Sequence, residues 1–303
     1  MFYFLSLLTG IIISVMIFVN GGLTANYGLY IASVIIHAVG LIANTILVLV
    51  KKQNPFTNLK QLKQQWFIYM GGAVGVFTIM GTNLAFGRIS VSAMLAIALF
   101  GQVLFGMIID QYGLFGMPKY PFKKSQMIGL IIILAGIVAM ITNFEIVAVA
   151  FVFATGFSIV LARTLNAKLA DLTTVQIGSF YNHVTGLIVC VIGCVVILFI
   201  WGPNTLAHTA KDLTFVGLLL FSSEWYIYTG GVLGLIVIIL SNLTVIKVSA
   251  FYLTLLVFIG QVFSGVVIDM LITQEVSMRN IIGGILVSIG LSVNLLLDNK
   301  VKT

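Results

Sequence analysis

Two long segments of this chain repeat each other without a gap, and the repeat includes polar residues. Residues 66–110 align with residues 225–269 at a constant separation of 159 positions, with 16 identities in 45 positions. Apolar helices resemble one another by composition alone, but that similarity would not align tryptophan, tyrosine, asparagine, glutamine and aspartate. The repeat predicts two homologous halves, residues 1–144 and 145–303. The matched polar pairs include Trp66/Trp225, Tyr69/Tyr228, Asn83/Asn242, Gln102/Gln261 and Asp110/Asp269 in the long block, and Asn20/Asn166, Ser33/Ser179 and His37/His183 in a block at a separation of 146.

The composition indicates that both halves lie in a membrane. Hydrophobic residues make up 60% of the chain and charged residues 8%, whereas a soluble domain carries about 25% charged residues. The apolar runs are long enough to cross a hydrocarbon core of about 30 Å as helices. We therefore predict an all-α integral membrane protein with ten spans, five in each half. The spans are expected near 2–20, 28–50, 66–87, 90–109, 125–143, 146–165, 175–200, 225–246, 248–270 and 279–297.

The basic residues predict the orientation of these spans. Loops on the amino-terminal side of the membrane hold twelve lysines and arginines, and loops on the other side hold three, namely Arg88, Lys211 and Arg279. The positive-inside rule then predicts that both termini are cytoplasmic. Five spans per half make the second half enter the membrane in the opposite sense to the first. The sequence thus predicts two inverted five-helix repeats, a common design among carriers.

Several motifs recur in both halves and resemble one family. Each half has the sequence Trp-x-x-Tyr-x-Gly-Gly-x-x-Gly before its third span, and then GQVLFGMIIDQYGLFGMP from Gly101 to Pro118, or GQVFSGVVID from Gly260 to Asp269. The chain resembles the YdcZ family of EamA-like proteins in the drug/metabolite transporter superfamily. That resemblance implies a ten-helix, inverted-repeat transporter in a bacterial inner membrane, and it leaves the substrate open. The second half lacks the Gly-Leu-Phe-Gly-x-Pro ending, so that loop need not be symmetric.

Polar side chains inside the predicted spans are the candidates for a binding site. Amides and imidazoles are costly in hydrocarbon unless they face a partner or water. Gln102 and Gln261 are the leading pair, because a glycine precedes each of them and another follows four positions later. The alternative is that each polar group forms a hydrogen bond that only holds helices together. Supporting candidates are Asn83, Asn242, Asn20, Asn166, His37 and His183, with Tyr181 as an aromatic wall.

Missing residue types restrict the chemistry. No predicted span carries a central Asp or Glu, which argues against the proton/cation exchange of the small multidrug-resistance relatives in the same superfamily. Proton coupling through His37 or His183 stays open. No metal-ligand spacing, catalytic triad or carboxylate pair is recognisable, so we expect no metal, no cofactor and no enzyme activity. The net charge of +7 is explained by lysines in cytoplasmic loops, so we expect no nucleic-acid partner.

Together these features predict a secondary transporter that moves a small polar, neutral or zwitterionic metabolite by alternating access. A flippase for an amphipathic or lipid-linked molecule is the alternative. The expected partners are the small-molecule substrate and the lipid bilayer, and a homodimer is left open. Four charges related by the repeat are predicted to form two ion pairs that break in turn during gating. These pairs are Arg88 with Asp269 outside, and Lys247 with Asp110 inside.

Overall fold

The computed structural model describes residues 1–56, 63–114, 121–141, 145–201, 224–245 and 250–299. Helices make up nearly all of this part of the chain. The α-helices are α1 (Phe2–Tyr27), α2 (Leu29–Val50), α3 (Gly71–Ala85), α4 (Val91–Tyr112), α5 (Gln126–Met140), α6 (Ile146–Leu172), α7 (Val175–Trp201), α10 (Gly230–Val245), α11 (Ala250–Thr273) and α12 (Met278–Asn299), and two 3₁₀ helices, η1 (Lys63–Met70) and η3 (Trp225–Thr229), precede α3 and α10.

Every predicted span coincides with a helix. Among the described residues, seven helices are long and apolar enough to cross a membrane: α1, α2, α3 with the turn before it, α4, α6, α7 and α11. The remaining three predicted spans appear as shorter apolar helices, at Gln126–Met140, Trp225–Ser241 and Met278–Asn294. The all-α membrane class is confirmed, and the count of ten spans stays a prediction.

The helices form two compact units, and neither unit corresponds to one predicted half. Unit 1 contains residues 1–15, 85–160 and 243–303, and unit 2 contains residues 16–84 and 161–242. Each unit therefore combines helices from both halves, and α1 and α6 contribute to both units. The division of the sequence at residue 144 remains a prediction about repeats, and it does not describe how the helices group.

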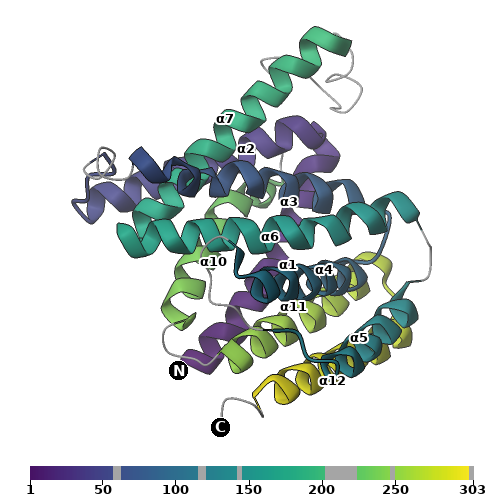
Figure 1. Cartoon of the computed structure of the whole chain (residues 1–303). Coiled ribbons are helices and arrows are strands. Elements are labelled where there is room, and N and C mark those ends of the chain that lie inside the picture. The colour runs from purple at the N-terminus through teal and green to yellow at the C-terminus, as the bar shows by residue number, and fades with distance from the viewer. Residues whose placement is uncertain (57–62, 115–120, 142–144, 202–223, 246–249, 300–303) are drawn as a thin grey trace. The chain divides into compact units, whose positions relative to one another are not determined.

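In unit 1, glycines bring α5 and α12 close together. α5 and α12 lie side by side (Figure 1), and Gly129 and Gly136 of α5 face Gly290 and Gly283 of α12. A Cβ atom added at Gly136 would lie 2.7 Å from the Gly283 carbonyl oxygen. Small residues allow such close backbone packing between membrane helices. α4 packs on α11 in the same unit, and α4 ends at Gly113, whose positive φ of 62° suits glycine.

In unit 2, α2 packs along α7, and two short 3₁₀ helices enclose small apolar clusters. The repeated Trp-x-x-Tyr motif forms η1 in one half and η3 in the other. Ile227 of η3 is buried against Leu23 of α1, and its repeat equivalent Ile68 of η1 is buried with Leu169 of α6. The two clusters are therefore built from equivalent positions of the two halves.

Candidate functional site

A pair of histidines lies between α2 and α7 in unit 2. The rings of His37 and His183 meet edge to face, with centroids 5.7 Å apart, and their residues are only 2% and 4% exposed. Each histidine precedes a glycine by three positions, and His37 packs against Gly186 while His183 packs against Gly40. The contact is reciprocal because the same His-x-x-Gly spacing occurs on both helices. A Cβ atom added at either glycine would overlap the facing ring unless that ring moved.

Further polar residues continue this interface along the same two helices. Asn44 lies two turns after His37 on α2 and donates a hydrogen bond from Nδ2 to the Ser179 hydroxyl at 2.5 Å. Its repeat equivalent on α7 is Cys190, which is buried. The contacts between α2 and α7 are thus reciprocal at the histidines and asymmetric at this position. Ser179 was not among the predicted site residues, although its repeat match with Ser33 was a usable signal.

The predicted asparagines of α1 and α6 contact the glycine pairs that begin α10 and α3. The Asn20 side-chain oxygen lies against Gly230, and the Asn166 side-chain oxygen lies against the equivalent Gly71. Asn166 also donates from Nδ2 to the Asn182 side-chain oxygen at 2.8 Å. Asn166 therefore forms the kind of structural hydrogen bond that the alternative anticipates, whereas the side-chain oxygen of Asn20 is buried without a hydrogen-bond partner among the described residues.

Tyrosines pack close to these residues in two places, each with one tyrosine of the repeated Trp-x-x-Tyr motif. The Tyr181 ring lies 4.7 Å from the Tyr69 ring, centroid to centroid, and its hydroxyl donates to the Pro55 carbonyl at 3.0 Å. In the second place, the hydroxyls of Tyr27 and Tyr228 share a hydrogen bond. Tyr181 was predicted as an aromatic wall. Tyr69 and Tyr228 were not predicted as site residues, although the repeated Trp-x-x-Tyr motif contains both.

The leading pair of glutamines belongs to unit 1. Gln261 follows Gly260, which packs on Gly10 of α1, and Gln102 follows Gly101, which packs on Gly156 of α6. A Cβ atom added at Gly260 would lie 3.1 Å from the Gly10 Cα atom, and one added at Gly101 would lie 3.2 Å from the Gly156 Cα atom. The glutamines therefore occupy equivalent positions beside equivalent helix crossings.

The side chains of the two glutamines differ in burial. Gln261 is buried at 8% exposure, and its backbone carbonyl accepts the Ser14 hydroxyl at 2.6 Å. Its side-chain amide has no hydrogen-bond partner among the described residues. Gln102 is only partly buried and interacts with other residues. The amide of Gln261 is thus not used as a bridge between described helices.

Asn83 and Asn242 complete the predicted set. Asn83 is buried in α3 at 5% exposure, and its side-chain nitrogen has no hydrogen-bond partner within the described part of the chain. The side chain of Asn242 lies outside the described residues. The predicted candidates are consequently divided, with the glutamines in unit 1 and the asparagines, histidines and Tyr181 in unit 2.

The charged residues predicted for gating have other contacts here. Arg88 pairs with Glu145 at 3.4 Å rather than with Asp269, and both side chains are about half exposed. Asp269 is buried and caps the start of α4 instead, accepting hydrogen bonds from the backbone nitrogens of Val91 and Ser92 at 2.7 and 3.0 Å. The side chains of Lys247 and Asp110 lie outside the described residues, so the exchange of pairs stays a prediction.

Two more donors complete the environment of Asp269. The Ser92 hydroxyl lies 2.5 Å from its carboxylate, and the side-chain nitrogen of Asn280 on α12 lies 3.2 Å from it. The positive end of the α4 helix dipole favours a carboxylate at this point. Asp269 therefore links α4, α11 and α12. Neither Ser92 nor Asn280 was predicted, because their role depends on helix packing.

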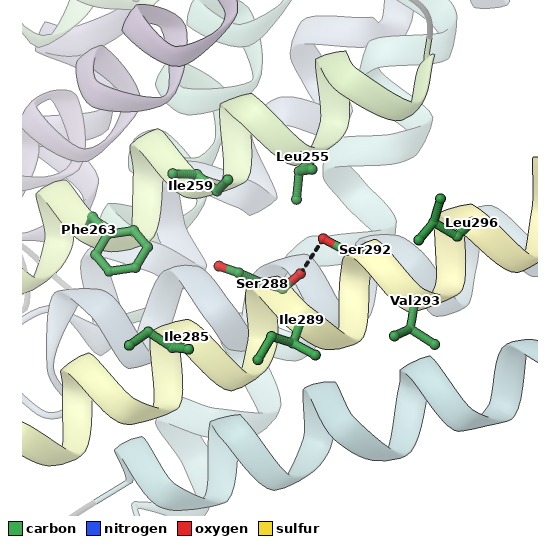
Figure 2. Close-up of a pocket in the computed structure, with 9 residues that line it drawn as sticks. All are labelled: Leu255, Ile259, Phe263, Ile285, Ser288, Ile289, Ser292, Val293 and Leu296. Atoms are coloured by element: carbon green, nitrogen blue, oxygen red, sulfur yellow. Dashed lines mark hydrogen bonds between the residues drawn. The ribbon is translucent and has the colours of Figure 1, made fainter.

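An apolar groove of about 300 Å³ lies between α11 and α12 in unit 1 (Figure 2). None of the predicted site residues lines it. The two hydroxyls in the groove are already used, since Ser288 donates to the Gly284 carbonyl and Ser292 donates to the Ser288 carbonyl, each at 2.8 Å. The groove suits an aliphatic group. Its lining residues are Leu255, Ile259, Phe263, Ile285, Ser288, Ile289, Ser292, Val293 and Leu296.

Comparison with known proteins identifies the family. The sequence model of the DMT_YdcZ family, described as "Putative inner membrane exporter, YdcZ", matches residues 1–139 and again residues 147–293. No curated protein matches the chain. A solved structure described as "Crystal structure of protein" is similar over 100% of this chain and 98% of its own, with a TM-score of 0.60 at 14% identity, which shows the fold alone. Since the family domain occurs twice and covers nearly the whole sequence, the chain belongs to the DMT_YdcZ family and is a multi-pass inner membrane protein.

Proposed function

We propose that this protein is a secondary transporter that moves a small polar, neutral or zwitterionic metabolite across the inner membrane by alternating access. The observation that carries the proposal is the reciprocity of contacts between the two halves. Gly10 packs on Gly260 as Gly156 packs on Gly101, and His37 meets Gly186 as His183 meets Gly40. A carrier of this kind needs two equivalent arrangements of one scaffold, and matched contacts are what allow them to exchange. The family description favours export.

The topology belongs to the same proposal. Ten spans in two inverted five-helix repeats, with both termini cytoplasmic, are supported by the twelve-to-three distribution of basic residues between the two sets of loops. They are also supported by the two separate matches to one family domain. Inversion lets equivalent residues of the two halves reach one site from opposite sides of the membrane.

The glutamines are proposed to bind the substrate. A glutamine amide offers two donors and an acceptor, which suits a zwitterion or a polar neutral solute. Gln261 is 8% exposed, and its side-chain amide forms no hydrogen bond with a described residue. This supports the role, because a purely structural amide would be hydrogen-bonded to a neighbouring helix. Gln102 is the equivalent residue in the other half. The proposed supporting residues are Asn83, Asn242, Asn20, Asn166, His37 and His183, with Tyr181 as an aromatic wall.

A ligand screen tests the proposal. Purified protein is heated with each member of a library of amino acids, nucleosides, sugars and polyamines, since a ligand that binds only the folded state raises the melting temperature. Gln261→Ala is expected to abolish the ligand-induced shift while leaving the melting temperature of the free protein nearly unchanged. Asn44→Ala is the matched control, because Asn44 bridges to Ser179. It should lower the melting temperature and keep the ligand shift.

Two outcomes would contradict the substrate role. Equal losses of stability and ligand response in Gln261→Ala and Gln102→Ala would make both residues structural. A ligand shift that survives both substitutions would move the site elsewhere. Transport itself is then measured by counterflow of the identified ligand in proteoliposomes, where absence of saturable uptake would contradict the proposed function.

The groove between α11 and α12 is the observation that favours the alternative of a flippase. Its apolar lining suits an acyl chain better than a polar solute. A flippase would move a fluorescent lipid between leaflets, and Ile289→Trp, which fills the groove, would slow that movement. Counterflow of a polar ligand that is unaffected by Ile289→Trp would favour the metabolite transporter.

A further inference from the structure

The histidine pair of unit 2 is not explained by structural hydrogen bonding. No described residue forms a hydrogen bond with either ring nitrogen of His37 or His183, and both residues are more than nine-tenths buried. A neutral imidazole carries one donor and one acceptor, and burying both without partners is unfavourable. Elsewhere on the same helices, the Asn44 side-chain nitrogen and the Thr185 hydroxyl do have hydrogen-bond partners, whereas the Asn44 side-chain oxygen has none among the described residues. The pair therefore keeps four unused nitrogens in a place where helices pack closely.

The helices packed next to the pair carry few charges. α2 and α7 carry the two rings, the start of α10 packs on α2 at Gly40, and the start of α3 packs on α7 at Asn182. None of these four helices contains Asp, Glu, Lys or Arg. α6 also contacts α7, through the hydrogen bond between Asn166 and Asn182, and it carries Arg163, Lys168 and Asp171. The remaining titratable residues of these helices and of the 3₁₀ turns before α3 and α10 are Tyr30, Tyr69, Tyr181, Cys190, Cys194, Tyr226, Tyr228 and, in the first turn of η1, Lys63.

The geometry allows the two rings to share one proton. The centroids lie 5.7 Å apart with ring planes at 67°, so rotation of a ring about its own bond turns a nitrogen of one imidazole toward the other. Each ring has a glycine opposite it in place of a side chain, Gly186 for His37 and Gly40 for His183. These glycines leave the rings in direct contact with each other. A mutual N–H···N hydrogen bond then satisfies one nitrogen of each ring.

We propose that His37 and His183 together form one binding site for a single proton, and that this proton is the coupling ion of transport. The statement that the proton is coupled to transport rests on the proposed function, whereas the binding of the proton does not. The proton comes from water and binds the lone pair of one ring nitrogen. The new N–H donates to the neutral second ring. Release returns the proton to water, and no bond other than N–H forms or breaks.

Proton binding is linked to the packing of α2 against α7. A neutral pair can remain in the dry interface, whereas a charged pair is stabilised by water, which requires the helices to separate there. An unperturbed histidine changes its charge between about pH 5 and 8, and burial in a dry interface disfavours the charged ring. Protonation thus favours a wetted arrangement of α2 and α7, and loss of the proton favours the close one.

Proton uptake by the purified full-length protein tests this inference. The measurement is made in weakly buffered detergent solution between about pH 5 and 8, in a His208→Gln background, which leaves the pair as the only histidines. We expect the uptake to fall by one proton per chain when His37→Gln and His183→Gln are combined. Each single substitution is expected to move the uptake below this pH range, because the remaining ring loses the neighbour that accepts its new N–H, so the test remains available if the double variant does not fold.

Spin labels provide a second readout that a merely structural role would not change. Labels are attached to cysteines at Ile46 of α2 and Ile192 of α7, which are 57% and 55% exposed, after replacement of Cys190 and Cys194 by alanine. The distance distribution is expected to shift with pH when both histidines are present. It is expected to be independent of pH in His37→Gln and in His183→Gln.

Three results would overturn the inference. The first is equal proton uptake with and without the histidines, and the second is a pH-dependent distance that survives their substitution. The third is a stoichiometric transition metal in the purified protein that His183→Gln removes, because a metal would then be the occupant. Metabolite binding in the thermal screen without any histidine-dependent proton uptake would leave transport standing and remove only the proton site. Proton uptake without any metabolite binding would leave the proton site standing and contradict the proposed transport of a metabolite.

Discussion

Replacing Asp269 by alanine removes the acceptor for the first two backbone nitrogens of α4. Its carboxylate accepts hydrogen bonds from the backbone nitrogens of Val91 and Ser92, from the Ser92 hydroxyl and from the Asn280 side chain. The residue is 7% exposed, so water cannot readily replace the lost acceptor. The alanine variant leaves two amide donors of α4 buried without partners.

The loss can be estimated from these contacts. A buried donor left without a partner costs about 1–3 kcal/mol, and loss of a helix cap costs about 0.5–2 kcal/mol. Because the bonds share two oxygens, their contributions are not additive, and we expect a destabilisation of about 3–5 kcal/mol for Asp269→Ala. That corresponds to about two to four orders of magnitude in the folded-to-unfolded ratio. Asp269→Asn keeps one oxygen acceptor and should lose less.

Glu145→Ala is the matched control. It removes a carboxylate from the same unit, but the Glu145 side chain is 48% exposed and pairs with Arg88 at 3.4 Å. Such exposed pairs contribute about 0–1 kcal/mol. Both variants are unfolded by SDS titration of the purified protein, with the tryptophan fluorescence as the signal. Similar midpoints for Asp269→Ala and Glu145→Ala would refute the capping role, as would full stability of Asp269→Ala.

Three further outcomes are expected. Gly186→Ala should destabilise the protein by about 1–3 kcal/mol, because a Cβ there overlaps the His37 ring. Gly193→Ala on the same helix is the control, since a Cβ at Gly193 would have nothing within 4 Å. Equal melting temperatures for the two variants would contradict the packing of the pair. Gly136→Leu should separate α5 from α12 and lower the melting temperature, while Gly106→Leu, which also has open space around it, should not; indifference to Gly136→Leu would argue against the close contact with Gly283. Cysteines introduced at Lys60 and Lys211 should be labelled from opposite sides of the membrane in intact cells, since their loops are predicted to be cytoplasmic and external; labelling of both from outside would reject the inverted topology.

The helices could be predicted from the sequence because each one satisfies its own backbone hydrogen bonds in hydrocarbon, which makes the length of an apolar run sufficient. The repeat was equally visible, since alignment of Asn83 with Asn242 or Gln102 with Gln261 needs no structure. These local features also led to the family that the comparisons identify. The sequence of an apolar run does not indicate which other run it packs against.

Only the tertiary structure shows which helices and which side chains contact one another. The grouping of α4, α5, α11 and α12 with the first part of α1 and of α6 divides the predicted site residues between two units. In the same grouping, Asp269 accepts a hydrogen bond at the start of α4, and Arg88 pairs with Glu145. The grouping also sets His37 against His183. For the histidine pair the reason is physical: Gly40 and Gly186 leave room for the facing rings, and that approach depends on the shapes of two helices at once rather than on either sequence alone.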